Sequence, residues 1–240
     1  MAVAETYDLP EALDTETFSK ELEEIVDDKA RNRIYHPFVE AVANGTATKD
    51  QFAGWIHQFS LWADPCNKYL GVMWANCPDE DIRSGLLDNI REEEHGYQSG
   101  IAGHVELIHR TCDAMGWDAA RRAQEEKRYE SWALHHWFEV VMTRRPFVES
   151  ICATSFTAER MNHVVFAKLE KGLREHYDLS EDAMLSVAVH ASDVEEEHAS
   201  LGPLAIDRYG TTAYDQANIR FAVTHTAEMY YRQYNVWEYY

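Results

Sequence analysis

The chain has 240 residues, of which 45% are apolar and 12% aromatic, enough to bury one sizeable hydrophobic core. Lys and Arg number 22 against 42 Asp and Glu, and the net charge of −20 at pH 7 has the wrong sign for binding nucleic acid or an anionic membrane. No apolar run approaches the roughly 18 residues of a membrane-spanning helix, no leader pattern opens the chain and the four cysteines are scattered, so we expect a cytoplasmic protein.

The sequence pattern is helical along the whole chain. Only 11 Gly and 6 Pro occur, and no long stretch alternates apolar and polar residues, which predicts an all-α protein. Thr48 and Gln51 form a capping box directly after the Asn44–Gly45 turn. We expect one domain over residues 1–240, with a short N-terminal extension over 1–14. Turn and cap residues predict about seven to eight helices, over 16–30, 34–43, 48–74, 79–113, 118–143, 146–173, 181–208 and 213–237.

The first cluster of chemically active side chains lies between Asp88 and His104. Apolar residues at one-turn spacing place Glu93 on the apolar face of the predicted helix, whereas Arg91 and His95 share a neighbouring face. Along an unbroken helix, His104 would lie about 16 Å from Glu93, at 1.5 Å per residue. Both can therefore bind one metal ion only if the segment bends, which the glycines at 96, 100 and 103 permit.

A second cluster lies in the helix predicted over 146–173. One stripe of this helix is formed by Glu149, Cys152, Phe156 and His163. Glu149 is the only acid in this otherwise apolar row. A buried carboxylate needs a cationic partner, which here is Arg144, Arg145 or a bound cation.

A third cluster lies in the helix predicted over 181–208. His198 interrupts an apolar row that consists of Met184, Val187, Ala191, Val194, His198 and Leu201. Metal-type ligands flank the row within two turns of His198, namely His190, Asp193, Glu195 and Glu197. The alternatives for these residues are a hydrogen-bonded core histidine and a solvated acidic face.

Acidic side chains and imidazoles from three separate helices are the ligands that a carboxylate-bridged iron site requires. The same residues could instead form an acid and base relay around an organic substrate, with His95 beside Arg91 and Glu94 titrating near neutral pH. The sequence contains no dinucleotide-binding glycine motif, no phosphate-binding loop, no serine-hydrolase motif and no His-Glu-x-x-His.

Six short motifs, in register from about residue 31 to 237, resemble those of the TenA and PqqC group of proteins. They are His36-Pro-Phe38, Asn44-Gly45 followed by Gln51-x-x-Gly54-Trp55, Ala75-Asn76-Cys77-Pro78-Asp79, Arg91-x-x-x-His95, Arg144-Arg145-x-x-x-Glu149-x-x-Cys152, and Glu197-His198. The resemblance implies the haem-oxygenase-like helical bundle of that group. Proteins with this fold catalyse several reactions, so the motifs are less specific for the reaction than for the fold.

Departures from the pattern separate the branches of the group. Gln58-Phe59 stands where a thiaminase has Asp, and the Lys in the last helix of PqqC has no clear equivalent, since the nearest basic residue is Arg220. The diiron branch is matched by Glu94, Gly96, His104 and Glu149. Its final His-x-x-x-Asp-x-x-His motif is approximated by His190, Asp193, Glu195 and His198, with a spacing that a one-residue bulge would restore.

The resemblance therefore implies an O2-dependent non-haem iron oxidase or oxygenase, with two iron ions per chain, that acts on a small, amino-acid-derived metabolite in a biosynthetic pathway. The expected metal ligands are Glu94, His104, Glu149, His190, Asp193, Glu195 and His198. The expected catalytic residues are Arg91, His95 and Glu149, and the expected substrate-binding residues are His36, Trp62 and Tyr97. Two alternatives stay open: a metal-free PqqC-like oxidase, in which Arg91 and His95 bind and protonate the substrate, and a non-catalytic helical binding protein. We also expect a homodimer.

Overall fold

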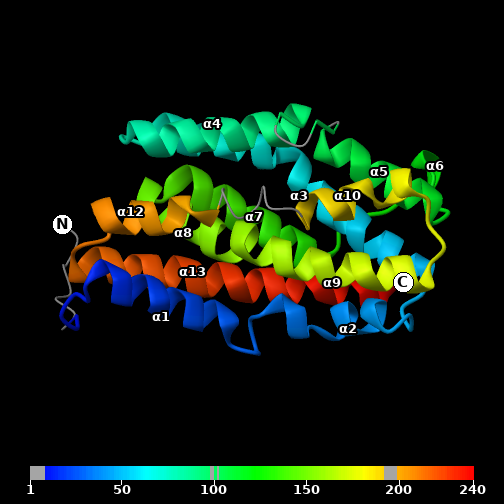
Figure 1. The fold of residues 1–240 in the computed structure, drawn as a ribbon, viewed down its shortest axis with the longest axis horizontal. Helices are drawn as coiled ribbons and strands as arrows, with labels where there is room; N and C mark the ends of the chain where they lie inside the picture. Colours follow the sequence, from blue (N-terminus) through cyan, green and yellow to red (C-terminus); the bar gives the residue numbers. More distant parts are fainter. Residues whose placement is uncertain (1–8, 98–99, 102, 192–198) are drawn as a thin grey trace.

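The computed structural model describes residues 9–97, 100–101, 103–191 and 199–240, and in these ranges the chain is helical and contains no strand. This confirms the predicted all-α class. The helices run mostly along the long axis of the molecule, with α4 along one edge and α1 and α2 along the opposite edge (Figure 1). The elements are α1 (Thr15–Asp27), η1 (Arg33–Tyr35), α2 (Pro37–Ala43), α3 (Lys49–Asn76), α4 (Glu80–His95), α5 (His104–Ala114), α6 (Ala119–Arg122), α7 (Tyr129–Arg144), α8 (Phe147–Thr154), η2 (Ser155–Glu159), α9 (Arg160–His176), α10 (Glu181–His190), α12 (Leu201–Tyr209), α13 (Ala213–Gln233) and η3 (Tyr234–Tyr239).

The described residues form more helical elements than the seven to eight that were predicted, because several predicted spans are divided, among them the span over 181–208, which becomes α10 and α12. The span over 79–113 divides into α4 and α5 at Gly96, which adopts a left-handed φ of 61°. The span over 118–143 divides into α6 and α7, and the span over 146–173 contains the π-helical turn η2. That the chain is one domain with a short N-terminal extension stays a prediction.

Helix α3 is the longest helix in the described chain and confirms the capping box at its start. Thr48 accepts from the Gln51 N–H at 3.1 Å, and the Gln51 side chain accepts from the Thr48 N–H at 2.9 Å. Pro65 lies inside the helix and has no N–H to donate to Leu61, four residues earlier. The Lys127 ammonium instead donates to the Leu61 carbonyl at 2.8 Å, which explains how the helix tolerates the proline.

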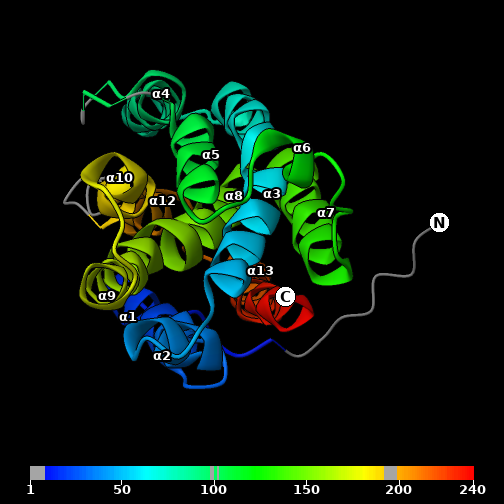
Figure 2. The same cartoon turned by 90° about the vertical axis from the view of Figure 1, so that its right-hand side faces the viewer.

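The core lies where α3, α8 and α13 pack against their neighbours. Helix α8 contacts α12 and α13, while α3 contacts α4, α5 and α7. Viewed along the long axis, α3 and α8 lie near the middle, while α10 and α4 lie farther out (Figure 2). Trp55 of α3 is fully buried, with its ring 4.8 Å from Phe38 and 4.9 Å from Tyr234. Burying each such aromatic side chain stabilises the fold by roughly 1.5–3 kcal/mol. No described helix combines the length and the apolar character needed to cross a bilayer.

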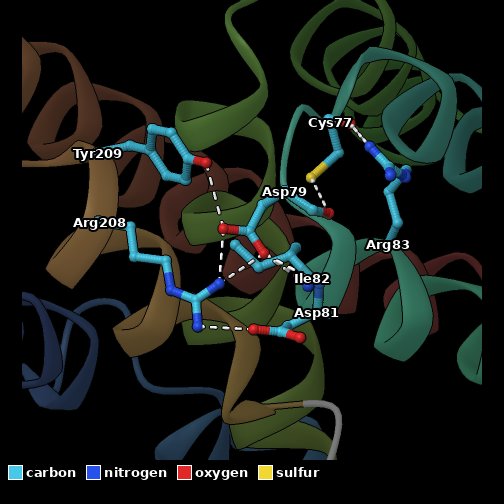
Figure 3. Close-up of polar contacts among 7 residues, drawn as sticks. All are labelled: Cys77, Asp79, Asp81, Ile82, Arg83, Arg208 and Tyr209. Atoms are coloured by element: carbon cyan, nitrogen blue, oxygen red, sulfur yellow. Dashed lines mark hydrogen bonds and ion pairs between the residues drawn. The ribbon is translucent and has the colours of Figure 1, made fainter.

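A buried carboxylate fixes the start of α4 against the end of α12 (Figure 3). Asp79 caps α4 by accepting from the Asp81 and Ile82 N–H groups at 3.0 and 3.1 Å. The Arg208 guanidinium donates to both Asp79 oxygens at 2.6 Å, and the Tyr209 hydroxyl donates to one of them at 3.2 Å. This hydrogen bonding to Arg208 lowers the pKa of Asp79 below 3.8.

We expect Asp79→Asn to lower the melting temperature at neutral pH, because Asn keeps the cap but loses the charge pair. The folded-state pKa of Asp79 lies below its ordinary value of 3.8, so the pair stabilises the fold above pH 3.8 and this contribution is lost as the pH falls. The difference in melting temperature from the wild type should therefore shrink at acid pH. Circular dichroism measures both temperatures, and Glu80→Gln, at an exposed position in the first turn of the same helix, is the control. A difference that does not depend on pH would contradict the assignment.

Candidate metal centre

Three helix ends converge on one group of potential ligands. Glu93 lies in the last turn of α4, His104 is the first residue of α5, and His190 is the last residue of α10. One ligand atom from each of these side chains lies within 4.8 Å of the others. Both histidines are buried, and Glu93 is about one quarter exposed. The group therefore lies at the edge of the core, where helix ends leave room for polar side chains.

His104 is bordered by two carboxylates. Its Nδ1 lies 3.0 Å from a Glu93 oxygen, and its Nε2 lies 3.4 Å from a Glu92 oxygen. Burial lowers the pKa of His104, but the charges of Glu93 and Glu92 outweigh it and raise the pKa to about 8. Without a bound metal ion, the ring thus carries a proton at neutral pH. A metal ion would take the place of that proton between the same side chains.

His190 is held in the form that binds metals. Its Nδ1 lies 2.7 Å from the Ser186 carbonyl, to which it donates, and its ring stacks on Phe166 at 4.8 Å. This hydrogen bond fixes the tautomer, so that Nε2 carries the lone pair. Burial, followed by the charge of His104, lowers the pKa of His190 to about 4 and keeps the imidazole neutral.

A narrow hollow of about 50 Å³ adjoins the group, bordered by both histidines and Glu93. Its wall is mostly apolar and includes Phe59, Trp62, Leu70, Ile108, Phe138, Met142 and Tyr230, with polar positions at Asn89, Glu159 and Asn162. A second hollow, of about 610 Å³, opens on the outside and also includes Glu159 in its lining. Glu159 therefore lies between the outer hollow and the candidate metal centre.

The π-helical turn η2 places Glu159 at this position. The Arg160 N–H donates to the Ser155 carbonyl, five residues earlier, so the turn contains one residue more than an α-helical turn. Asn89 of α4 donates to the Glu159 carboxylate at 3.2 Å and holds it toward the hollow. After the extra residue, Asn162 lies in the wall of the narrow hollow, while His163 lines the outer one.

The side chains fit an iron ion. Two imidazoles and a set of carboxylates are the borderline nitrogen and hard oxygen donors that non-haem iron prefers. The Ser186 carbonyl accepts from His190 and orients its ring, and the short distances around His104 show that the ligands are already gathered. The same donor set could also hold other divalent ions of the first transition row.

The structure brings together some of the predicted site residues but not others. His104 and His190, both predicted as metal ligands, lie close together, and the bend at Gly96 brings His104 back to Glu93 of α4. The other predicted residues of α4 lie on its exposed side: the Glu94 carboxylate accepts from Asn67 at 3.1 Å, and Arg91 lies 3.5 Å from Asp88. His95 and Tyr97 are also exposed, with Tyr97 stacked under the Arg91 guanidinium.

The remaining predicted residues differ in position. Glu149 is buried and pairs with Arg145 at the start of α8, outside the wall of the hollow. His36 caps α2 by accepting from the Phe38 N–H at 3.1 Å and also lies outside that wall. Trp62 lies in the wall. Asp193, Glu195 and His198 fall outside the described residues, and the roles predicted for all of these residues stay predictions.

Two carboxylates near the site were not selected from the sequence. Glu92 follows Arg91 directly and is fully buried, although three consecutive acids gave no sign of which one points inward. Glu159 lies three residues after Phe156, on the stripe that Glu149 begins, but helical spacing does not show which of these two acids reaches the hollow.

Comparison with known proteins identifies relatives in sequence and in fold. A 4-aminobenzoate synthase of Nitrosomonas europaea is 24% identical over 217 residues, which cover 85% of this chain and 84% of that protein. A pyrroloquinoline-quinone synthase of Pseudomonas aeruginosa is 31% identical over 109 residues, 45% of this chain and 42% of that protein. The crystal structure of a TenA homologue from Pseudomonas syringae superimposes with a TM-score of 0.77 at 15% identity, over 97% of this chain and 100% of that one. The last match shows a shared fold.

The family whose sequence model matches the chain is described as iron-containing redox enzymes, and the match extends over residues 53–231. This range covers most of the helices and includes Glu93, His104, Glu159 and His190. The chain therefore belongs to the iron-containing redox enzyme family with the haem-oxygenase-like fold, and it is an oxidoreductase.

Proposed function

We propose that the protein binds iron at Glu93, His104 and His190 and uses O2 to oxidise a small metabolite. The observation that carries this proposal is the convergence of three ligand atoms within 4.8 Å, from the consecutive helices α4 and α5 and the distant helix α10. Membership of the iron-containing redox enzyme family supports the choice of metal. The biosynthetic role is supported by the names of two relatives, a 4-aminobenzoate synthase and a pyrroloquinoline-quinone synthase.

The two-ion form of the site remains part of this proposal. Glu92 lies 3.4 Å from His104, and Glu159 lies in the wall of the same hollow, so two further carboxylates are available for a second ion. Carboxylates suit this role because they can bridge two cations and balance their charge. Asp193, Glu195 and His198 are the further ligands proposed from the sequence.

The protein's own residues have separate roles around the metal: holding a proton, orienting a ligand and excluding water. Bound ferrous iron would supply the electrons that O2 needs to react with an organic molecule. Glu93 and Glu92 favour a proton on His104 at the place where the metal would bind, and Ser186 orients His190. The apolar wall excludes bulk water, which strengthens every electrostatic interaction inside and limits side reactions.

Metal content is the direct test. We expect the full-length protein, loaded anaerobically with ferrous iron and desalted, to retain two iron atoms per chain by elemental analysis. One atom per chain would support the metal centre but refute the two-ion form. No retained iron would refute the proposed function and favour the metal-free alternative. Sedimentation of the same sample tests the proposed homodimer.

A further inference from the structure

Two hydrogen-bond donors in the wall of the narrow hollow have no partner among the described residues. They are the indole N–H of Trp62 and the hydroxyl of Tyr230. Trp62 is 5% exposed and Tyr230 is 1% exposed, so bulk water does not solvate either group. A buried donor without an acceptor is costly, and native proteins contain few of them. A hydrogen-bond acceptor bound inside the hollow would satisfy both donors.

The two donors belong to one aromatic group. The Tyr230 ring meets the Trp62 ring edge to face, with 5.6 Å between the centroids, and Phe138 stacks on Trp62 at 4.7 Å. Because packing fixes these rings, the indole nitrogen of Trp62 and the hydroxyl oxygen of Tyr230 stay in place and do not reach acceptors elsewhere. The sequence places them far apart, on α3 and α13, and the fold brings them to one wall.

A buried positive charge lies directly behind this wall. Arg33 is 1% exposed, and its guanidinium lies 4.1 Å from the centroid of the Tyr230 ring. Its hydrogen bonds go to neutral acceptors, among them Asn162 Oδ1 at 3.1 Å and the Thr157 carbonyl at 2.7 Å. Among the described residues, no carboxylate forms an ion pair with Arg33. A buried charge without a counter-charge favours an anion nearby.

We propose that Trp62 and Tyr230 form the subsite for a carboxylate group of the substrate, with Arg33 behind them making the subsite selective for an anion. The proposal rests on the proposed function for the reaction at the metal centre. A carboxylate offers acceptors and no donors, which matches these two donors. The two carboxylates in the same wall, Glu93 and Glu159, are the ones proposed to bind metal. The hollow of about 50 Å³ is larger than the roughly 30 Å³ of one water molecule, yet far smaller than the roughly 150 Å³ cavity that binds benzene. It can thus hold a carboxylate and the adjoining carbon atom, but not a whole aromatic ring.

The test follows the indole N–H signals of the full-length protein by NMR with ¹⁵N-labelled tryptophan, in metal-free and Zn²⁺-loaded samples. Acetate is the probe, and acetamide is its neutral counterpart of the same shape. We expect acetate to shift the Trp62 signal to saturation, and acetamide to need at least about tenfold higher concentration. Trp117 and Trp137 are internal controls because their N–H groups already donate to Asp50 and Thr226, so their signals should not move.

The tyrosine is tested by substitution. Tyr230→Phe should weaken acetate binding about tenfold, whereas Tyr177→Phe should leave it unchanged, because the hydroxyl of that buried tyrosine donates to the Ala47 carbonyl. Equal responses to acetate and acetamide, or an unmoved Trp62 signal in both samples, would overturn the subsite. Iron content is measured separately in each variant and should not change. Retained iron without an acetate response refutes the subsite alone, and an acetate response without retained iron refutes the metal centre alone.

Discussion

His190→Ala should abolish iron binding at the candidate centre while the protein stays folded. His190 is the neutral, oriented imidazole of the group, with its Nδ1 tied to the Ser186 carbonyl and its pKa lowered to about 4 by burial. Removing a group that hydrogen-bonds to a metal ligand typically weakens metal binding about 10 to 100 fold, so removing the ligand itself should weaken it at least about a hundredfold. Anaerobic calorimetric titration with ferrous iron measures the change.

The matched control is His95→Ala. Each of the two histidines is the last residue of its helix, α10 or α4, but His95 is exposed. We expect His95→Ala to bind iron like the wild type. Thermal unfolding adds a second readout, because a ligand at 100 times its Kd stabilises the native state by about 2.7 kcal/mol, and this stabilisation should vanish in His190→Ala alone. Iron binding by His190→Ala at wild-type affinity would refute the assignment of the centre.

Gly96→Ala should both destabilise the protein and remove the metal centre. Gly96 ends α4 with φ 61°, and a Cβ built on it would lie 1.4 Å from the carbonyl oxygen of Ile101, a backbone atom that cannot rotate away. The left-handed conformation alone costs a non-glycine residue about 1–2 kcal/mol, and relieving the clash requires moving the chain that returns to His104. We therefore expect a loss of at least about 3 kcal/mol in the free energy of unfolding. Chemical denaturation measures this loss.

Gly100→Ala is the control that separates the cost of backbone strain from the cost of the steric clash in Gly96→Ala. Gly100 also has a left-handed φ, of 70°, but no atom of the described residues lies within 4 Å of a Cβ at that position. This variant should therefore lose only the roughly 1–2 kcal/mol of backbone strain and keep its iron. If Gly96→Ala binds iron like Gly100→Ala, the tight bend at Gly96 is not what brings Glu93 to His104.

The prediction of the site from sequence succeeded where local spacing was sufficient. The apolar periodicity of the segment before Gly96 placed Glu93 on the inner face, and the distance along a straight helix showed that His104 could reach it only through a bend. In the structure α4 ends at His95 and α5 begins at His104, so the chain does bend there, and a Glu93 oxygen lies 3.0 Å from His104. The fully buried acid of α4, however, is Glu92. The family pattern selected Glu94 instead, and that residue lies on the exposed side of α4.

The prediction was less informative at Glu149 and Glu159. Both lie on one helical stripe, and the spacing cannot tell which of them meets the cluster. Arg145 pairs with Glu149 one turn away, whereas the π-helical turn and Asn89 hold Glu159 toward the hollow. A π-helical turn adds one residue, and no reliable sequence signal predicts it. Counting helical turns from Glu149 therefore does not show which residues after the π-helical turn lie on the same face as Glu149.

The amino-acid sequence alone determined the all-α class, most helix boundaries, the need for a bend before His104 and the resemblance to the haem-oxygenase-like group, because caps, glycines and 3.6-residue periodicity act over a few residues. Only the tertiary structure decided that Glu93 and not Glu94 joins His104 and His190, that Glu159 borders the hollow, and that Trp62 and Tyr230 face it together. Those choices depend on how whole helices pack against one another. This packing depends on many contacts between segments that are distant in the sequence, so a short sequence pattern does not predict it.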